Sequence, residues 1–280
     1  MQKTKNEWAD YTWNPISGCL HDCPYCYAEK IANRFGTIDK NEWDYEDAIE
    51  EIRTEDYGTI VEINERLEKE PCPYNFIPTF HRYHLNKPQK IKTPQNIFVG
   101  SMGDTFGRWM PDEWIQEVFK ACEAAPWHRW LFLTKNSKRY DCLRHLLADG
   151  KKYDNWWFGV TATNQTSFDE QAGNLDFHAT GYNTFVSLEP LQGRIELDGL
   201  GNTGINWVIV GAMTGPKAKQ HQPKREWVAD IVTACKEANV PVFLKNNLKS
   251  IWESCPGCGH GGKCYGECRT LIQEWPWEVK

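Results

Sequence analysis

The sequence lacks any long hydrophobic run. No stretch of about 18 apolar residues occurs along the chain, which excludes an ordinary membrane-spanning helix. The start, MQKTKNEWADYTW, has no apolar segment that would serve as a signal peptide. We therefore expect a cytoplasmic protein that does not associate with a membrane.

The chain also lacks a surplus of basic residues. It has 32 lysines and arginines against 38 aspartates and glutamates, a net charge of -6, so the composition is not that of a general nucleic-acid binder. A local basic groove is still compatible with it. Hydrophobic residues make up 40% of the 280 residues, which is enough for the core of one large domain or a barrel with a small addition.

Cysteine is abundant, but its distribution does not indicate a disulfide framework. The 11 cysteines are an odd number in a chain without an export signal, so metal binding is favoured over disulfides. Seven of them form two tight clusters, at 19–26 and at 255–268. Cys122 and Cys235 lie on the apolar faces of predicted helices, and we interpret them as core residues.

From residue 97 onward, short apolar runs alternate with polar residues and helix-like stretches. The runs are IFVGS (97–101), WLFLT (130–134), WWFGV (156–160), TFVSL (184–188), WVIVG (207–211) and VPVFL (240–244). They predict buried parallel strands, and 111–126 and 225–240 predict amphipathic helices. The predicted fold is α/β, a partial (β/α) TIM-type barrel over residues 1–246 with an insertion at 36–95 covering its mouth. A small Cys-rich, metal-binding C-terminal appendix would occupy 247–280.

Polar residues follow each of the six runs. They are Asp104, Lys135 with Asn136, Thr161 with Thr163 and Asn164, Glu189, Thr214, and Lys245 with Asn246. In a β/α barrel the carboxyl ends of the strands meet at the active site, so this distribution is typical of an enzyme of that architecture. For a single residue, exit of the strand into a solvated loop is the alternative. We interpret His81 and His84, in the insertion, as solvated or structural rather than as ligands.

Three cysteines stand in the loop GCLHDCPYCYAE with the spacing Cys-x3-Cys-x2-Cys: Cys19, Cys23 and Cys26. Three thiolates in so short a loop hold one face of a 4Fe–4S cluster and leave the fourth iron open for chemistry. A tetrahedral zinc site needs a fourth ligand, for which His21 is poorly placed. A Cys-x2-Cys redox pair would leave Cys19 unexplained. The three cysteines are therefore the predicted catalytic and metal-binding residues.

With this spacing, and with the aromatic Tyr25 before the last cysteine, the sequence resembles the radical S-adenosylmethionine superfamily. The resemblance implies that the open iron chelates the methionine amino and carboxylate groups of S-adenosylmethionine. It also implies one-electron reduction by a flavodoxin- or ferredoxin-like donor, giving a 5′-deoxyadenosyl radical that abstracts hydrogen from the substrate.

The same resemblance implies a set of cofactor-binding residues. Tyr25 would lie by the adenine, Ser101, Gly103 and Asp104 by the methionine amino group, Thr161, Thr163 and Asn164 near the ribose, and Lys135 and Glu189 toward cofactor or substrate. Many members carry Gly-Gly-Glu where this chain has SMGD, so Asp104 is assigned by position. A helix N-cap or a salt-bridge partner is the alternative reading of Asp104.

Over most of its length the chain also resembles a phage-associated family of unknown function with a radical-enzyme-like core. The matching stretches are TWNPISGC, CPYCYAEKIANRF, IFVGSMGDTF, WLFLTKN, FGVTATNQ, VSLEPLQGRIEL, WVIVGAMTGP and VPVFLKN, and the match ends near Lys245. The style of the motifs is similar to that of spore photoproduct lyase, a DNA-repair enzyme. A nucleobase, in DNA or in a nucleotide, is therefore the first substrate hypothesis, and a peptide or small molecule is the alternative.

The second cluster, in SCPGCGHGGKCYGEC, supplies Cys255, Cys258, Cys264 and Cys268. Four thiolates complete the coordination of zinc or of a second 4Fe–4S cluster, and the sequence leaves both open. If both clusters were structural, the protein would be a zinc-stabilised module that binds nucleic acid or protein without catalysis. That hypothesis does not explain why the first cluster has only three thiols.

Overall fold

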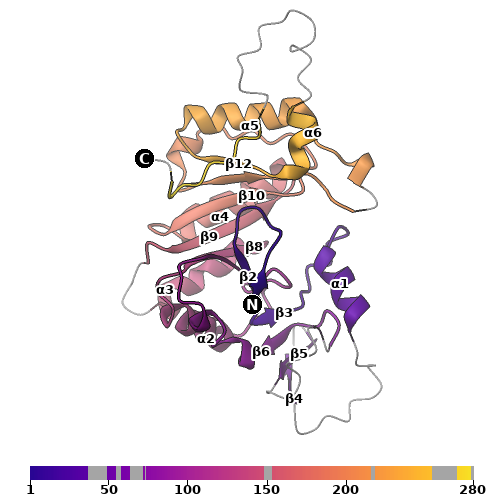
Figure 1. Cartoon of the computed structure of the whole chain (residues 1–280), viewed down its shortest axis with the longest axis vertical. Coiled ribbons are helices and arrows are strands. Elements are labelled where there is room, and N and C mark those ends of the chain that lie inside the picture. Colours follow the sequence, from indigo (N-terminus) through magenta and orange to yellow (C-terminus); the bar gives the residue numbers. More distant parts are fainter. Residues whose placement is uncertain are drawn as a thin grey trace, which may run out of the picture. The chain divides into compact units, whose positions relative to one another are not determined.

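A computed structural model of the chain describes residues 1–36, 49–54, 58–63, 72, 74–147, 153–215, 218–253 and 270–278. The chain divides into two compact units, Met1–Trp157 and Phe158–Lys280, and Figure 1 labels most of their helices and strands. Across the residues so described, no helix combines the length and the apolar character that a membrane span requires.

The first unit contains four strands in the hydrogen-bonded order β1-β2-β7-β8. The edge strand β1 (Gln2–Lys3) is antiparallel to β2 (Tyr11–Trp13). Strands β2, β7 (Asn96–Val99) and β8 (Arg129–Thr134) are parallel to one another. Because these three strands run in one direction, their carboxyl ends lie along the same edge of the sheet. The polar residues predicted to follow the strands of this unit come directly after that edge.

The helices of the first unit are α1 (Tyr27–Phe35), α2 (Asp112–Glu123) and the short α3 (Leu143–Leu146). The predicted apolar stripe of α2 is buried in full: Trp114, Ile115, Val118, Phe119 and Cys122. Burying a large apolar side chain stabilises the fold by about 1.5–3 kcal/mol, so this stripe is enough to hold α2 against the sheet. Cys122 is fully buried, as is Cys235 in the second unit, which confirms both as core residues.

A second sheet of the first unit has the order β3-β6-β5-β4. Strand β3 (Ile16–Ser17) is antiparallel to β6 (Thr79–His81), β5 (Gly58–Ile63) is parallel to β6, and β4 (Ile49–Thr54) is antiparallel to β5 (Figure 1). The predicted insertion, 36–95, therefore carries three strands that the sequence analysis did not predict. Its charged residues mask the strand pattern, since IEEIRT shows no strict apolar–polar alternation. That the insertion covers a barrel mouth stays a prediction.

His81, at the end of β6, is a structural residue. Its side chain is buried, with Nε2 2.8 Å from the Ser17 hydroxyl and Nδ1 3.1 Å from the Tyr83 hydroxyl. The ring stacks on that of His84, whose Nδ1 lies 2.7 Å from the backbone oxygen of Asn14. The two histidines thus fasten β6 to β3 and to the end of β2, as the structural interpretation predicted.

The buried His81 makes the stability of the fold depend on pH. Burial, aided by nearby His84 and Lys87, lowers the pKa of His81 to about 3. An unfolded histidine titrates near pH 6.5. Below that pH, His81 binds a proton in the unfolded chain but stays neutral in the folded chain. The free energy of unfolding should therefore fall between about pH 6.5 and 3, by at most about 1.4 kcal/mol per pH unit from this group.

Denaturant unfolding of wild type and of His81→Gln at about pH 7, 6 and 5 measures this contribution. Glutamine keeps an amide near Ser17 but does not titrate. The variant should lose less stability than wild type on acidification. Equal losses in the two proteins would show that His81 is not the titrating group.

In the second unit, β9 (Trp156–Ala162), which begins at the boundary, is followed in the strand order by β10 (Asn183–Leu188), β11 (Val208–Val210) and β12 (Val242–Leu244). The pairs β10–β11 and β11–β12 are parallel. The helices are α4 (Gln165–His178), α5 (Arg225–Glu237) and the short α6 (Lys249–Trp252). Short 3-10 helices in the two units are Arg82–His84, Pro88–Lys90, Ser137–Cys142, Leu200–Asn202, Ala218–Gln220 and Asn246–Leu248.

The segment 270–278 packs against β12. The Leu244 N–H donates to the Ile272 oxygen at 2.7 Å, and the Trp207 indole donates to the Glu274 oxygen at 2.9 Å. The cysteines of the second cluster, Cys255, Cys258, Cys264 and Cys268, lie outside the described residues. The metal site assigned to them, and the boundary drawn at 246/247, stay predictions.

All six predicted apolar runs contain strands, and the pairs β2–β7, β7–β8, β10–β11 and β11–β12 are parallel. The fold prediction is therefore confirmed as a mixed α/β architecture with parallel strands. In neither unit do the described strands close on themselves into a barrel.

Candidate functional site at the cysteine loop

The cysteine loop, residues 18–26, follows β3 and is fastened at its start to the loop after β7. Gly18 forms a parallel bridge with Gly103, and its N–H donates to the Met102 oxygen at 2.9 Å. Gly18 has a φ of 81°, and a Cβ there would lie 2.2 Å from the Ile77 oxygen. A Cβ on Gly103 would lie 2.6 Å from the Gly18 oxygen. Glycine at position 18 is therefore required by its φ and by the approach to Ile77, and glycine at position 103 by the approach of its backbone to that of Gly18.

Cys19, Cys23 and Cys26 are free and partly buried. The Cys19 N–H donates to the Phe76 oxygen at 3.1 Å, and the Cys26 N–H donates to the Cys23 oxygen at 2.9 Å. Cys26 is also the N-cap of α1, where its sulfur accepts from the Glu29 N–H at 3.4 Å. The end of the cysteine loop is thus fixed by the helix that follows it.

The electrostatic surroundings favour neutral thiols at two of the three positions when no cation is present. Burial, and next the Asp104 carboxylate, raises the pKa of Cys19. Burial also raises the pKa of Cys23, although the Lys135 ammonium acts in the opposite direction. Because metal centres bind thiolates, ligation here would be coupled to proton release.

The donor set of the loop fits an iron–sulfur cluster. Three free thiols on one short loop are the soft ligands that such clusters take. The sulfurs are not gathered around one point, because within the described ranges no three His, Cys, Asp or Glu side chains are arranged to hold a metal ion. The ligand type and the spacing of the cysteines therefore agree with the predicted 4Fe–4S site, whereas the three sulfur atoms do not converge on one point in this structure.

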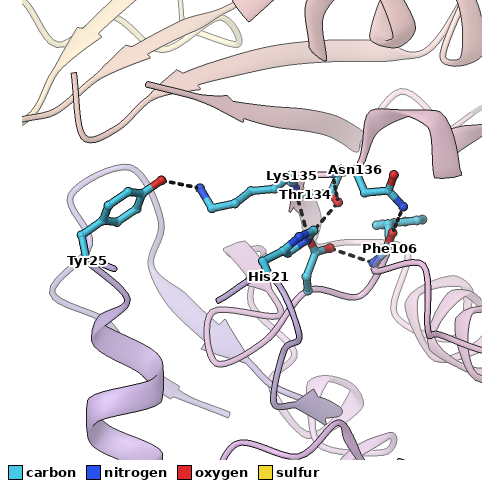
Figure 2. A network of polar contacts seen from close by, with 7 residues as sticks. His21, Tyr25, Phe106, Thr134, Lys135 and Asn136 are labelled. Carbon is cyan, nitrogen blue, oxygen red and sulfur yellow. Dashed lines mark hydrogen bonds and ion pairs between the residues drawn. The ribbon is translucent and has the colours of Figure 1, made fainter. Parts of the chain in front are cut away.

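Asp104, after β7, is the centre of a polar network around the cysteine loop, and Figure 2 labels its partners His21, Phe106, Thr134 and Lys135. Its side chain is buried, and Oδ2 lies 2.7 Å from His21 Nε2, 2.9 Å from the Thr134 hydroxyl and 3.0 Å from the Lys135 N–H. Oδ1 accepts from the Phe106 N–H at 3.0 Å. One carboxylate thus joins the cysteine loop, the loop after β7 and the end of β8.

The protonation state of Asp104 follows from these contacts. Burial by itself would raise its pKa, but the hydrogen bond and charge of His21, with donors from Lys135 and Thr134, outweigh burial and lower it. The side chain is therefore a carboxylate held by protein donors. These contacts are of the salt-bridge kind that the sequence analysis gave as the alternative to a cofactor ligand.

Two residues of this network were not among the predicted site residues. His21 was weighed only as a fourth zinc ligand, yet its ring meets the Asp104 carboxylate and contacts the Trp109 ring edge-on, with centroids 5.0 Å apart. Thr134 also accepts the Asn136 N–H at 2.9 Å. Two features of the sequence could have identified them as site residues: Thr134 is the last residue of a predicted strand, and His21 lies within the cysteine loop.

Tyr25 and Lys135 meet on one side of the cysteine loop. The Lys135 ammonium lies 3.5 Å from the Tyr25 hydroxyl and 5.4 Å from the centre of its ring, and Figure 2 shows the lysine side chain reaching across to the tyrosine. Burial, with the nearby Cys23, raises the pKa of Tyr25 to about 12. The pair therefore presents a neutral phenol beside a cation.

Ser101 is held by two residues that the sequence analysis did not assign. Its hydroxyl donates to the Asn14 side-chain oxygen at 3.1 Å, and the same oxygen accepts from the Met102 N–H at 3.2 Å. The Tyr27 hydroxyl donates to the Ser101 backbone oxygen at 2.6 Å. Asn14 ends the stretch TWN directly after β2, so its position at a strand end was the signal.

The remaining predicted site residues belong to the second unit. Thr161 is largely buried in β9, and the Thr163 oxygen accepts from the Gln192 N–H at 2.9 Å. Asn164 is the N-cap of α4 and forms a capping box with Ser167, whose N–H it accepts at 3.0 Å. The Asn164 side chain thus has a helix-capping role in this structure.

Glu189, directly after β10, pairs with Lys245, directly after β12. The Lys245 ammonium lies 2.5 Å from Glu189 Oε1, and both side chains are partly buried. A Cβ on Gly211, after β11, would lie 2.8 Å from the Glu189 carboxyl carbon, so glycine leaves room for this pair. Three strand ends of the second unit therefore meet here, as their shared direction predicts.

Comparison with known families and solved structures finds similarity over most of the chain. The family model described as "Protein of unknown function (DUF5131)" matches residues 3–256. The match runs past Lys245, where the sequence analysis ended it, and takes in Cys255. No curated protein matches the chain, and the phage association stays a prediction.

Solved structures of spore photoproduct lyase are similar in fold. A tyrosine-to-phenylalanine mutant of that enzyme gives a TM-score of 0.50 at 12% identity, covering 87% of this chain and 78% of that one. A cysteine-to-alanine, serine-to-cysteine double mutant with bound AdoMet and dinucleoside spore photoproduct gives 0.46 at 15% identity. That match covers 78% of this chain, which spans only 61% of the length of the enzyme. At these identities the likeness concerns the fold.

Proposed function

We propose that this chain, which belongs to the family described as Protein of unknown function (DUF5131), is a radical S-adenosylmethionine enzyme acting on a nucleobase-containing substrate. The observation that carries the proposal is the loop of three free thiols, fastened through Gly18 and Gly103 to the strand-end loop that follows β7. The likeness in fold to a spore photoproduct lyase structure supports the architecture that this function needs.

Cys19, Cys23 and Cys26 would hold a 4Fe–4S cluster and leave one iron without a protein ligand. When bound, the cluster and S-adenosylmethionine supply a one-electron cleavage that yields a 5′-deoxyadenosyl radical. The chain holds the cysteine loop in place, orients the cofactor and keeps water away from the reacting atoms. An electron donor of the flavodoxin or ferredoxin type would be the partner.

The residues around the cysteine loop suit the two ends of the cofactor. Tyr25 offers an aromatic face for the adenine, and the Lys135 ammonium beside it attracts a carboxylate. Ser101 and Gly103, on the loop bridged to Gly18, would line the methionine end. The roles of Thr161, Thr163, Asn164 and Glu189 toward cofactor or substrate rest on the superfamily resemblance.

A nucleobase in DNA or in a nucleotide is the proposed substrate, in line with the similarity of the sequence motifs to those of spore photoproduct lyase, which by its name acts on a spore photoproduct. A peptide or small molecule is the alternative within the same chemistry. A zinc-stabilised binding module without catalysis is the alternative of another class. The second cysteine cluster would hold zinc or a second 4Fe–4S cluster.

Anaerobic reconstitution separates these classes. We expect the purified chain to bind iron and sulfide in the ratio of a 4Fe–4S cluster and, with dithionite and S-adenosylmethionine, to release 5′-deoxyadenosine, detected by liquid chromatography and mass spectrometry. Counting iron and zinc in the same sample also decides what the second cluster holds. A colourless protein that contains only zinc would refute the radical mechanism.

Addition of candidate substrates tests the nucleobase. An oligonucleotide or nucleotide should increase 5′-deoxyadenosine formation or yield a base of altered mass. If DNA, RNA and nucleotides all leave turnover unchanged, the substrate is a peptide or small molecule.

A further inference from the structure

We propose that Asp104 is a positioning residue that holds the cysteine loop through His21, and that it does not bind the methionine amino group of the cofactor. The inference deepens the proposed function and rests on it. It changes the role assigned to the acidic residue of the SMGD motif, from binding the cofactor to holding the cysteine loop.

The first support is the occupancy of the carboxylate. Oδ2 of Asp104 meets donors of His21, Thr134 and Lys135 within 3.0 Å, and Oδ1 accepts from Phe106. A carboxylate oxygen has about two lone-pair sites, so Oδ2 has no capacity left for an ammonium group, and Oδ1, which already accepts from Phe106, has one site left. With only 5% of the residue exposed, Asp104 also has little surface from which to reach a ligand.

The second support is the place of His21 in the cysteine loop, between Cys19 and Cys23. The bridge of Gly18 fixes the start of the loop, and Cys26 fixes its end by capping α1. His21 is the contact that fixes the middle, since its Nε2 lies 2.7 Å from Asp104 Oδ2.

The third support is that the His21 ring is held from a second direction. The indole of Trp109 contacts it nearly at right angles, 71° between the planes, and Trp109 is itself buried. Asp104 and Trp109 lie on the same segment after β7. A histidine held by both has one orientation, and this restricts the loop that carries the thiols.

Four variants separate the anchor from the ligand role. His21→Leu removes the donor to Asp104, and His21→Gln keeps an N–H at a similar reach. Asp104→Asn keeps an acceptor but removes the charge. His145→Leu is the matched control. His145 makes a similar 2.8 Å contact with an aspartate, Asp112, and neither residue belongs to the cysteine loop.

Three measurements apply to each variant. The alkylation rates of Cys19, Cys23 and Cys26 in the metal-free protein, followed by mass spectrometry, report how firmly the loop is held. The rate of iron loss to a chelator reports the same in the reconstituted protein. The dissociation constant for S-adenosylmethionine, scaled to intact clusters, reports direct contact with the cofactor.

We expect His21→Leu to accelerate alkylation and iron loss by about tenfold, the scale of a lost hydrogen bond to a charged group. His21→Gln should recover most of this effect, and His145→Leu should show none. Asp104→Asn should accelerate iron loss while changing the affinity for S-adenosylmethionine less than about twofold.

Other results would overturn the assignment. If Asp104→Asn keeps its iron but binds S-adenosylmethionine about tenfold more weakly, Asp104 is a cofactor ligand. Equal metal loss in His21→Leu and His21→Gln would make His21 itself a metal ligand. If wild type takes up no iron, the proposed function fails, and the alkylation rates of the metal-free protein still decide whether His21 and Asp104 hold the loop.

Discussion

Replacing Cys26 by serine is expected to remove the iron–sulfur cluster while leaving the fold in place. Cys26 caps α1 through its sulfur, at 3.4 Å from the Glu29 N–H. Serine is a better N-cap than cysteine and keeps the helix start, but its hydroxyl is a poor ligand for iron compared with a thiolate. Two thiols then remain, and they do not hold a cluster with one open iron. The iron held by the cysteine loop, about four atoms per chain, should be lost, and formation of 5′-deoxyadenosine should fall to the level without protein.

The measurement is iron and sulfide per chain after reconstitution, together with 5′-deoxyadenosine after reduction. The matched control is Cys122→Ala, which removes a thiol buried in α2. That variant should lose stability, because a core atom is missing, yet keep its iron at temperatures where it is folded. A Cys26→Ser protein with full iron and undiminished cleavage would contradict the assignment of the cysteine loop.

Gly18→Ala is expected to be the most damaging substitution for the geometry of the cysteine loop. The φ of 81° costs about 1–2 kcal/mol for any residue with a Cβ. The new methyl carbon would also lie 2.2 Å from the Ile77 oxygen, a backbone atom in the bend before β6 that cannot rotate away as a side chain would. Together these effects should lower the free energy of unfolding by about 2–4 kcal/mol and separate the loop from Gly103.

Chemical denaturation measures the loss, and iron retention measures the displacement of the loop. The control is Gly173→Ala, because a Cβ at that helical position in α4 meets nothing within 4 Å. It should raise the free energy of unfolding by about 0.5–1 kcal/mol. If Gly18→Ala is as stable as wild type and retains iron normally, the close contact between the two loops is not needed for the site.

The elements that sequence predicted well are those set by local pattern. The apolar runs became β7 to β12, and the stripe of α2 is buried as its spacing indicated. On the apolar face of α5, Val228, Ile231, Val232 and Cys235 are buried, whereas Trp227 is only half-buried. Such features depend on residues a few positions apart, so their signal is present in any short window. Strand β4 was missed because its charged residues hide any alternation, β6 because it is only three residues long, and β5 was missed although its sequence is largely apolar.

The candidate site was predictable only in part for the same physical reason. The spacing of the three cysteines is local, and it indicates an open iron–sulfur site before any fold is known. The local sequence does not show which polar residues at the strand ends are already hydrogen-bonded to other residues. Asp104 and His21 are 83 positions apart, and Glu189 and Lys245 are 56 apart, so only the folded chain shows that these side chains are paired.

By itself, the sequence determined the kind of ligand and the kind of architecture: three thiols on one short loop, and parallel strands whose polar residues follow their carboxyl ends. The tertiary structure alone decided how the cysteine loop is held. Gly103 allows its loop to touch the loop of Gly18, Gly18 allows that loop to approach Ile77, and one buried carboxylate gathers His21, Thr134 and Lys135 around it. Close backbone approach and buried hydrogen bonding depend on distances between remote segments, and those distances exist only once the strands have paired.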